Sequence, residues 1–249
     1  GDTLISDRLP EKSPEVLIKA SSYYMSNRQF FINFITSLFR KYKEQIDAES
    51  ANVSCENRQV GEFTALAHQN LVRDYLNIYT PYRGLLLYHG LGSGKTCTSI
   101  GIAEGLKSHK RVLIMTPASL RANFYKELKK CGDPLFRKNQ YWEFVKTGKN
   151  EDLIRMISRA ISLPSGFIEK QGGAWLINVQ KPGNYSSLTA AQQRQLDQQL
   201  NEMIEAKYDF VNYNGLRESS LAKLTKNNTI NPFDNKVIIV EEAHNFVGR

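Results

Sequence analysis

Short apolar segments alternate with helical patterns along much of this 249-residue chain, and this alternation constrains the fold more than any other feature. The apolar segments have the length of buried strands, and the stretches between them place apolar residues at helical spacing. Such alternation is typical of a parallel sheet that is covered by helices on both faces. We therefore predict an α/β fold with strands at 84–89, 111–116, 173–179, 208–213 and 236–240. Helices are predicted at 26–45, 64–79, 95–108, 118–131, 150–162 and 188–207.

The first predicted helix, 26–45, carries an apolar stripe and precedes a polar connector. The simple interpretation is a helix that packs on a neighbour, and the alternative is a helix that docks a partner. Capping boxes are predicted at Ser26 with Gln29 and at Thr189 with Gln192, and Asn150 is predicted to cap a third helix. We expect a helical extension and connector at 1–60 and an α/β domain at 61–249.

A glycine-rich run follows the predicted strand at 84–89. Its glycines permit a tight loop whose backbone N–H groups point at one centre, and the next helix offers its N-terminus to an anion. Lys95 adds a charge for phosphates, and Thr96 offers a hydroxyl to Mg²⁺. The strict pattern requires glycine where this chain has His89, but the relaxed pattern is complete. The predicted phosphate loop comprises Gly90, Gly92, Ser93, Gly94, Lys95, Thr96 and Cys97, and the alternative is a turn with a solvated lysine.

Two adjacent acids, Glu241 and Glu242, follow the predicted strand at 236–240. Carboxylates at the end of a buried strand need a counter-charge, which Mg²⁺ bound to phosphates would supply. In P-loop nucleotide hydrolases an acid at this place holds the metal, and another group acts on the attacking water. We therefore expect Glu241 and Thr96 at the metal, and Glu242 and Lys95 in catalysis. The alternative is an ordinary helix N-terminus, where the helix dipole favours acids.

Positive charge is concentrated in one part of the sequence. The stretch from Lys107 to Lys149 contains eleven Lys and Arg side chains and three acids. Its local excess of eight positive charges equals the net charge of +8 for the whole chain. Aromatic residues are interleaved, so this stretch could attract a phosphate backbone. The alternative is a solvated helical face over core aromatics.

Together these motifs resemble motifs I and II of superfamily 2 helicases of the DEAD/DEAH type, with "EEAH" in place of the DEAH box. The segments "HQNLVRDYLNIYTPYRGLLLYHGLGSGKTCTSIGIAEGLK", "VLIMTPASLRANFYKELKKCGD", "YDFVNYNGL" and "NKVIIVEEAHNF" are similar to the helicase and early transcription-factor ATPases of nucleocytoplasmic large DNA viruses. The N-terminal "YYMSNRQFFINFITSLF" also resembles segments ahead of the ATPase core in that family. The fold that the resemblance implies is a RecA-like P-loop domain.

The resemblance also implies residue roles. It places Gln69 at the adenine and His244 in the coupling of hydrolysis to nucleic-acid binding, while Tyr213 falls near motif Ib. The expected contacts to a nucleic-acid backbone are Thr116, Pro117, Ser119 and Arg121. The alternatives are a plain surface glutamine at position 69 and an ordinary strand-end turn at 116–119.

The function that the resemblance implies is a nucleic-acid-dependent ATPase, a helicase or translocase, that uses ATP and Mg²⁺. Two alternatives are an ATP-driven switch in a viral transcription assembly and a non-catalytic ATP-binding scaffold. We expect DNA rather than RNA as the partner, with viral transcription or replication proteins, and no membrane because no apolar run approaches the roughly 18 residues of a span. The expected location is the viral factory in the host cytoplasm, or the virion.

Two departures from the family pattern affect these expectations. Glu241 stands where the family has aspartate, and one further methylene alters its reach to a metal. The sequence stops at Arg249, before motif III and a second RecA-like domain. We therefore expect these 249 residues to carry half of a composite site, to bind ATP weakly and to unwind nothing by themselves.

Overall fold

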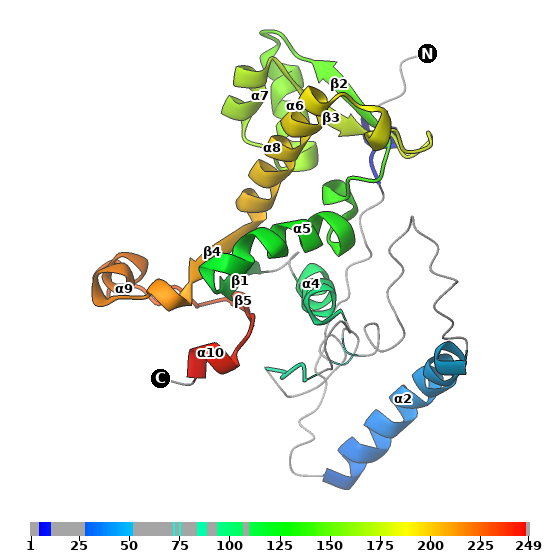
Figure 1. Ribbon diagram of the computed structural model, residues 1–249, viewed down its shortest axis with the longest axis vertical. Helices are drawn as coiled ribbons and strands as arrows, with labels where there is room; N and C mark the ends of the chain where they lie inside the picture. The colour runs from blue at the N-terminus through cyan, green and yellow to red at the C-terminus, as the bar shows by residue number, and fades with distance from the viewer. Residues whose placement is uncertain are drawn as a thin grey trace. The chain divides into compact units, whose positions relative to one another are not determined.

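The computed structural model describes residues 5–10, 28–51, 72, 75, 84–88, 94–106 and 110–247. They fall into two compact units, one drawn from 1–12 with 109–249 and the other from 13–108. Figure 1 shows the chain coloured from the N-terminus to the C-terminus, with its helices and strands labelled. The predicted boundary at residue 60 stays a prediction.

The larger unit is built on a parallel sheet of three strands, β1 (Arg111–Thr116), β4 (Tyr208–Asn212) and β5 (Lys236–Val240), in the order β4-β1-β5. Val112 pairs with Tyr208 on one side and with Val237 on the other, and both ladders are parallel. All three strands lie where the apolar runs predict them. The predicted α/β class is therefore confirmed, and the architecture fits a RecA-like domain.

Different segments cover the two faces of this sheet. On one face Ile114 and Phe210 lie beneath α5 (Arg121–Cys131), whose Phe124 ring meets Phe210 edge-on at 6.1 Å. On the other face Leu113 and Met115 form a cluster with Tyr213. Tyr213 begins the 3-10 turn η5 (Tyr213–Gly215), which follows β4 directly. The central strand β1 is buried, as expected for a parallel strand covered on both faces, whereas β4 and β5 are mostly half-buried and Ile238 of β5 is 41% exposed.

A second, antiparallel sheet pairs β2 (Trp142–Lys146) with β3 (Gly173–Ile177). The strand predicted at 173–179 does form, at 173–177, but it lies in this separate antiparallel pair and not in the parallel sheet. Gly173 is required here, because a side chain on it would collide with the backbone oxygen of Val145. Sheet membership depends on a partner strand that is distant in sequence, so an apolar run alone does not predict it.

The long helices around this second sheet begin where their caps predict. Asn150 accepts a hydrogen bond from the Leu153 N–H at 3.1 Å and starts α6 (Glu151–Ile161). Thr189 and Gln192 form the predicted capping box of α8 (Ala190–Lys207). Each cap satisfies backbone N–H groups that a helix start leaves unpaired, so short-range sequence determines these boundaries.

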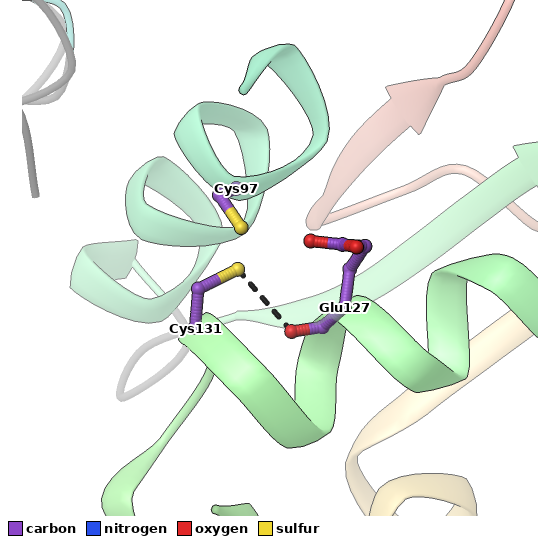
Figure 2. A group of neighbouring side chains, drawn as sticks. All are labelled: Cys97, Glu127 and Cys131. Carbon is purple, nitrogen blue, oxygen red and sulfur yellow. Dashed lines mark hydrogen bonds between the residues drawn. The ribbon is translucent and has the colours of Figure 1, made fainter. Parts of the chain in front are cut away.

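Short elements complete the larger unit. The helices are α1 (Ile5–Arg8), α7 (Ser165–Gln171), α9 (Glu218–Leu224) and α10 (His244–Val247). The 3-10 turns besides η5 are η2 (Ala118–Leu120), η3 (Pro134–Phe136) and η4 (Tyr185–Ser187). At the end of α5 the Cys131 sulfur lies 3.2 Å from the backbone oxygen of Glu127, as Figure 2 shows.

The smaller unit contains two described helices, α2 (Arg28–Ala51) and α4 (Lys95–Leu106). Both were predicted, and Ile100 and Ala103 of α4 are fully buried as expected. Ser26, the predicted cap of α2, and most of the predicted helix at 64–79 lie outside the described residues. None of the helices described in either unit is both long and apolar enough to span a membrane.

The strand predicted at 84–89 is wrong for the residues that the structure describes. Residues 84–88 have neither helical nor strand structure. Leu86 and Tyr88 are 77% and 92% exposed, so this run does not have the burial that an apolar strand requires. A short apolar run indicates a strand only when another strand pairs with it.

Candidate functional site

The carboxyl ends of the three parallel strands lie at one edge of the sheet. Ligands of open parallel sheets bind at this edge. The chain leaves β5 at Glu241, whose N–H donates to the Met115 carbonyl at 2.9 Å and so extends the pairing with β1 by one residue. The acidic pair is thereby fixed beside the end of β1.

Tyr213 holds the backbone of the acidic pair. Its side chain is 7% exposed, and its hydroxyl donates to the Glu241 carbonyl at 2.8 Å, with the Glu242 carbonyl at 3.1 Å. Burial raises the pKa of this phenol, and the negative charges of Glu242 and Glu241 add to the effect. The hydroxyl therefore keeps its proton through the neutral range and remains a donor.

The backbone turns sharply at the second acid. Glu242 has φ +52°, in the left-handed region that non-glycine residues seldom adopt. Its carbonyl accepts a hydrogen bond from the Asn245 N–H at 2.8 Å. Its carboxylate lies 3.3 Å from Nδ1 of His244, a contact that becomes an ion pair when the histidine is protonated. The Glu242 side chain remains 44% exposed, so it is accessible to a ligand.

The described part of the glycine-rich run is the start of α4. Gly94 has φ +77°, which suits glycine, and its carbonyl accepts hydrogen bonds from the Thr98 N–H at 2.9 Å and from the Thr98 hydroxyl at 3.1 Å. Lys95 and Thr96 are half-buried in the first helical turn, and Cys97 is buried. The remaining predicted members lie outside the described residues: Gln69, Gly90, Gly92 and Ser93.

The residues predicted to contact nucleic acid differ in exposure. Thr116 and Pro117 are buried at the end of β1, whereas Ser119 and Arg121 lie on the surface. Arg121 forms an ion pair with Glu205 of α8 at 3.7 Å. Of the four predicted contacts, only Ser119 and Arg121 are therefore accessible to a nucleic acid.

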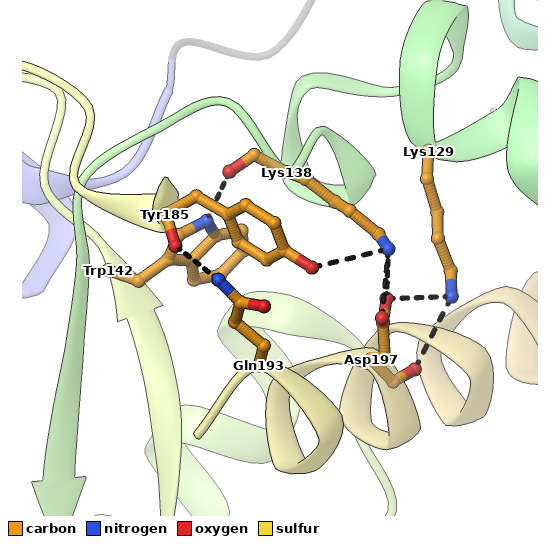
Figure 3. A network of polar contacts seen from close by, with 6 residues as sticks. All are labelled: Lys129, Lys138, Trp142, Tyr185, Gln193 and Asp197. Atoms are coloured by element: carbon orange, nitrogen blue, oxygen red, sulfur yellow. Dashed lines mark hydrogen bonds and ion pairs between the residues drawn. The ribbon is translucent and has the colours of Figure 1, made fainter. Parts of the chain in front are cut away.

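Several cations of the basic stretch have acidic partners. Asp197 of α8 lies 3.1 Å from Nζ of Lys129 and 2.6 Å from Nζ of Lys138, as Figure 3 shows. Burial lowers the pKa of Lys129, against the opposing charge of Asp197. Burial also opposes the charged form of Lys138, but the hydrogen bond and charge of Asp197 outweigh it and raise the pKa of that lysine. Part of the basic stretch is therefore structural.

Sequence reasoning missed the role of Tyr213 at the acidic pair. The motif pattern places this residue near a nucleic-acid motif, 28 positions before Glu241. The two meet only because β4 and β5 flank β1 and end at the same edge of the sheet. A buried tyrosine needs a partner for its hydroxyl, and that requirement was the available signal.

The fold is an α/β domain whose acidic pair lies at the carboxyl edge of a parallel sheet. Comparison with known proteins gives relatives among large DNA viruses. The chain is 37% identical over 113 residues to "Putative ATP-dependent RNA helicase R563" of Acanthamoeba polyphaga mimivirus. The aligned region covers 45% of this chain and 19% of the relative. It is 25% identical over 180 residues to "Putative helicase 087L" of Invertebrate iridescent virus 3, covering 72% of this chain and 15% of the relative.

A third relative is "Termination factor NPH-I homolog" of African swine fever virus, 27% identical over 100 residues, or 39% of this chain and 14% of the relative. The resemblance to helicase-like proteins of large DNA viruses is thus confirmed. The chain spans less than a fifth of the length of each of these relatives. No family model matches the chain, and no solved structure matches it.

Proposed function

We propose that this chain forms the ATP-binding part of a nucleic-acid-dependent ATPase that moves along or unwinds nucleic acid. The observation that carries the proposal is the acidic pair Glu241–Glu242, fixed at the carboxyl edge of a parallel sheet. Two relatives support the proposal, because both are named as helicases and the mimivirus relative is named as ATP-dependent.

The donor set at this edge suits a hard divalent cation. Glu241 and Glu242 offer carboxylate oxygens, which Mg²⁺ prefers, and Glu242 is accessible to solvent. Burial is the main cause of the raised pKa of Tyr213, and the negative charges of Glu242 and Glu241 add to it. Glu241 and Thr96 would hold Mg²⁺, which would neutralise charge on the phosphates of bound ATP.

The remaining roles belong to side chains of this chain. Lys95 would contact the β- and γ-phosphates as a point charge, and Gln69 would read the adenine. Glu242 would orient the attacking water and accept its proton, and the water would displace the γ-phosphoryl group in line. His244, 3.3 Å from Glu242, would respond to nucleic-acid binding through that contact. Action of both motifs on one ATP is part of the proposal.

The test uses the full-length protein that contains these residues. Lys95→Ala should abolish ATP binding, measured by calorimetry. Glu242→Gln should retain ATP binding and lower turnover by about 10²- to 10⁴-fold, the usual contribution of a general base. Lys170→Ala and Glu169→Gln change exposed residues of α7 and serve as matched controls. Unchanged turnover in Glu242→Gln would rule out hydrolysis at this site.

Strand separation requires a separate measurement. A fluorescent duplex with a single-stranded tail reports unwinding, whereas release of phosphate reports only hydrolysis. ATP-dependent loss of the duplex by the parent protein, absent in Glu242→Gln, supports the helicase function. Phosphate release without any loss of duplex would restrict the proposal to translocation.

A further inference from the structure

An open groove of about 770 Å³ lies on the outer surface of the larger unit, between α5 and α8. Its walls are Arg121, Tyr125, Lys126, Lys129 and Lys130 of α5 and Glu205 of α8, with Lys138 at one side. Five cations thus face a single acid of the lining, with Asp197 as the further acid that contacts two of them. The groove keeps an excess of positive charge even after these pairings.

The cations of the groove have two different roles. Lys129 and Lys138 both contact Asp197, and Arg121 pairs with Glu205, so these three fix the walls. Lys126 and Lys130 are exposed, and the described part of the chain gives neither an ion pair. They lie four residues apart on α5, which is about 6 Å along the helix axis. Two such side chains can meet successive phosphates of one strand.

An aromatic layer stiffens the same wall. The Tyr125 ring stacks on Phe210 of β4, with centroids 4.7 Å apart and an angle of 24°. The Arg121 guanidinium carbon lies 5.1 Å from the Phe210 ring centroid, and the Tyr125 hydroxyl donates to Glu205 at 3.0 Å. A rigid wall loses less conformational entropy when a ligand binds.

The position of the groove indicates its occupant. It begins at Ala118, immediately after the buried end of β1, and includes Arg121, a predicted nucleic-acid contact. We propose that a single-stranded nucleic acid runs from this sheet edge along α5, with its phosphodiester backbone in the α5/α8 groove and Lys126 and Lys130 on its phosphates. This inference rests on the proposed function, because it extends the path of the same strand.

Counterion release gives a quantitative test. Each phosphate neutralised on a single strand contributes about 0.7 to the slope of log affinity against log salt concentration. Lys126→Gln/Lys130→Gln in the full-length protein should therefore reduce that slope by about 1.4, measured with fluorescent single-stranded DNA and RNA of 20 nucleotides. Glutamine and lysine have similar helix propensities, so α5 should persist in the variant.

The matched control removes the same charge from the same stretch of sequence. Lys146 and Lys149 are exposed near the end of β2 and do not line the groove. Lys146→Gln/Lys149→Gln should keep the slope of the parent. Acetylation by N-hydroxysuccinimide acetate adds a second readout, since bound strand should protect Lys126 and Lys130 but leave Lys146 and Lys149 reactive.

The outcomes separate the inference from the function on which it rests. The groove alone would be overturned if the parent binds the strand and Glu242→Gln loses turnover, but the Lys126→Gln/Lys130→Gln variant keeps the parent's salt slope. In that case Lys126 and Lys130 would also remain unprotected from acetylation. No binding of DNA or RNA by the parent, with or without a non-hydrolysable ATP analogue, would overturn both. An equal loss of slope in the control pair would show that only net charge matters, and the groove would again be rejected.

Discussion

At the scale of single residues, the Tyr213 hydroxyl is the side-chain contact described at the backbone of the acidic pair, beside the backbone bond from Glu241 to Met115. The hydroxyl lies within hydrogen-bond distance of the Glu241 and Glu242 carbonyls, and the φ of Glu242 lies in an unfavourable region. Such strain persists only when the surrounding structure holds it. A positioned carboxylate depends on this support, because small displacements of a catalytic group reduce rates strongly.

Tyr213→Phe should therefore lower kcat for ATP by about tenfold to a hundredfold, with little change in KM. The loss of stability should be about 1 kcal/mol, the usual value for one hydrogen bond. Steady-state kinetics and urea unfolding check both numbers. Tyr185→Phe, whose hydroxyl lies 3.4 Å from Lys138 and away from the acidic pair, is the control. A fall in stability with unchanged kcat would reduce Tyr213 to a structural residue.

At the scale of elements, one side chain of α8 pairs with the backbone of β3 in the manner of a neighbouring strand. The buried amide of Gln199 donates to the Trp175 carbonyl at 2.8 Å and accepts from the Trp175 N–H at 2.7 Å. Both backbone groups are thereby satisfied, although β3 has a paired strand on its other side. This contact attaches the helix to the small sheet.

Gln199→Leu should lower the free energy of unfolding by about 2 to 4 kcal/mol, since it leaves a buried donor and a buried acceptor without partners. The midpoint of urea unfolding should fall while the slope of the transition stays constant. Gln198→Leu changes the adjacent exposed residue and should stay within about 0.5 kcal/mol of the parent. A similar effect of both substitutions would contradict the special role of Gln199.

At the scale of the whole molecule, the basic stretch both stabilises the larger unit and leaves charge at its surface. Asp197 joins α8 to α5 through Lys129, and to the segment before β2 through Lys138 (Figure 3). The Lys129 side chain is only 10% exposed, so this pair is partly screened from water. Removal of Asp197 would leave a largely buried ammonium group without its partner.

Asp197→Asn should cost on the order of 2 kcal/mol at neutral pH, less than a fully buried pair because Asp197 itself is one-third exposed. Burial already lowers the folded-state pKa of Lys129, and without Asp197 it falls further below that of the unfolded chain, so the unfolded state binds more protons. The stability of the variant should therefore rise with pH, and its deficit should shrink towards pH ~10.5. Urea unfolding at pH 7 and pH 10 checks this trend, with Asp152→Asn as an exposed control. A deficit that is constant with pH would contradict it.

Local patterns determined much of the larger unit from sequence alone. Strand positions for β1, β4 and β5, and the starts of α6 and α8, follow from apolar runs and from caps such as Asn150. The acids after β5 and their place at the sheet edge follow from the same patterns. These features depend on neighbours within a few residues, so the sequence carries them directly.

Tertiary structure decided which segments meet. It separated β2 and β3 into their own sheet, left 84–88 without strand structure, and brought Tyr213 to Glu241 and Gln199 to Trp175. It also assigned Lys129 and Lys138 to Asp197 while it left Lys126 and Lys130 exposed. Each of these outcomes depends on burial and on partners 20 or more residues away, which no local pattern specifies.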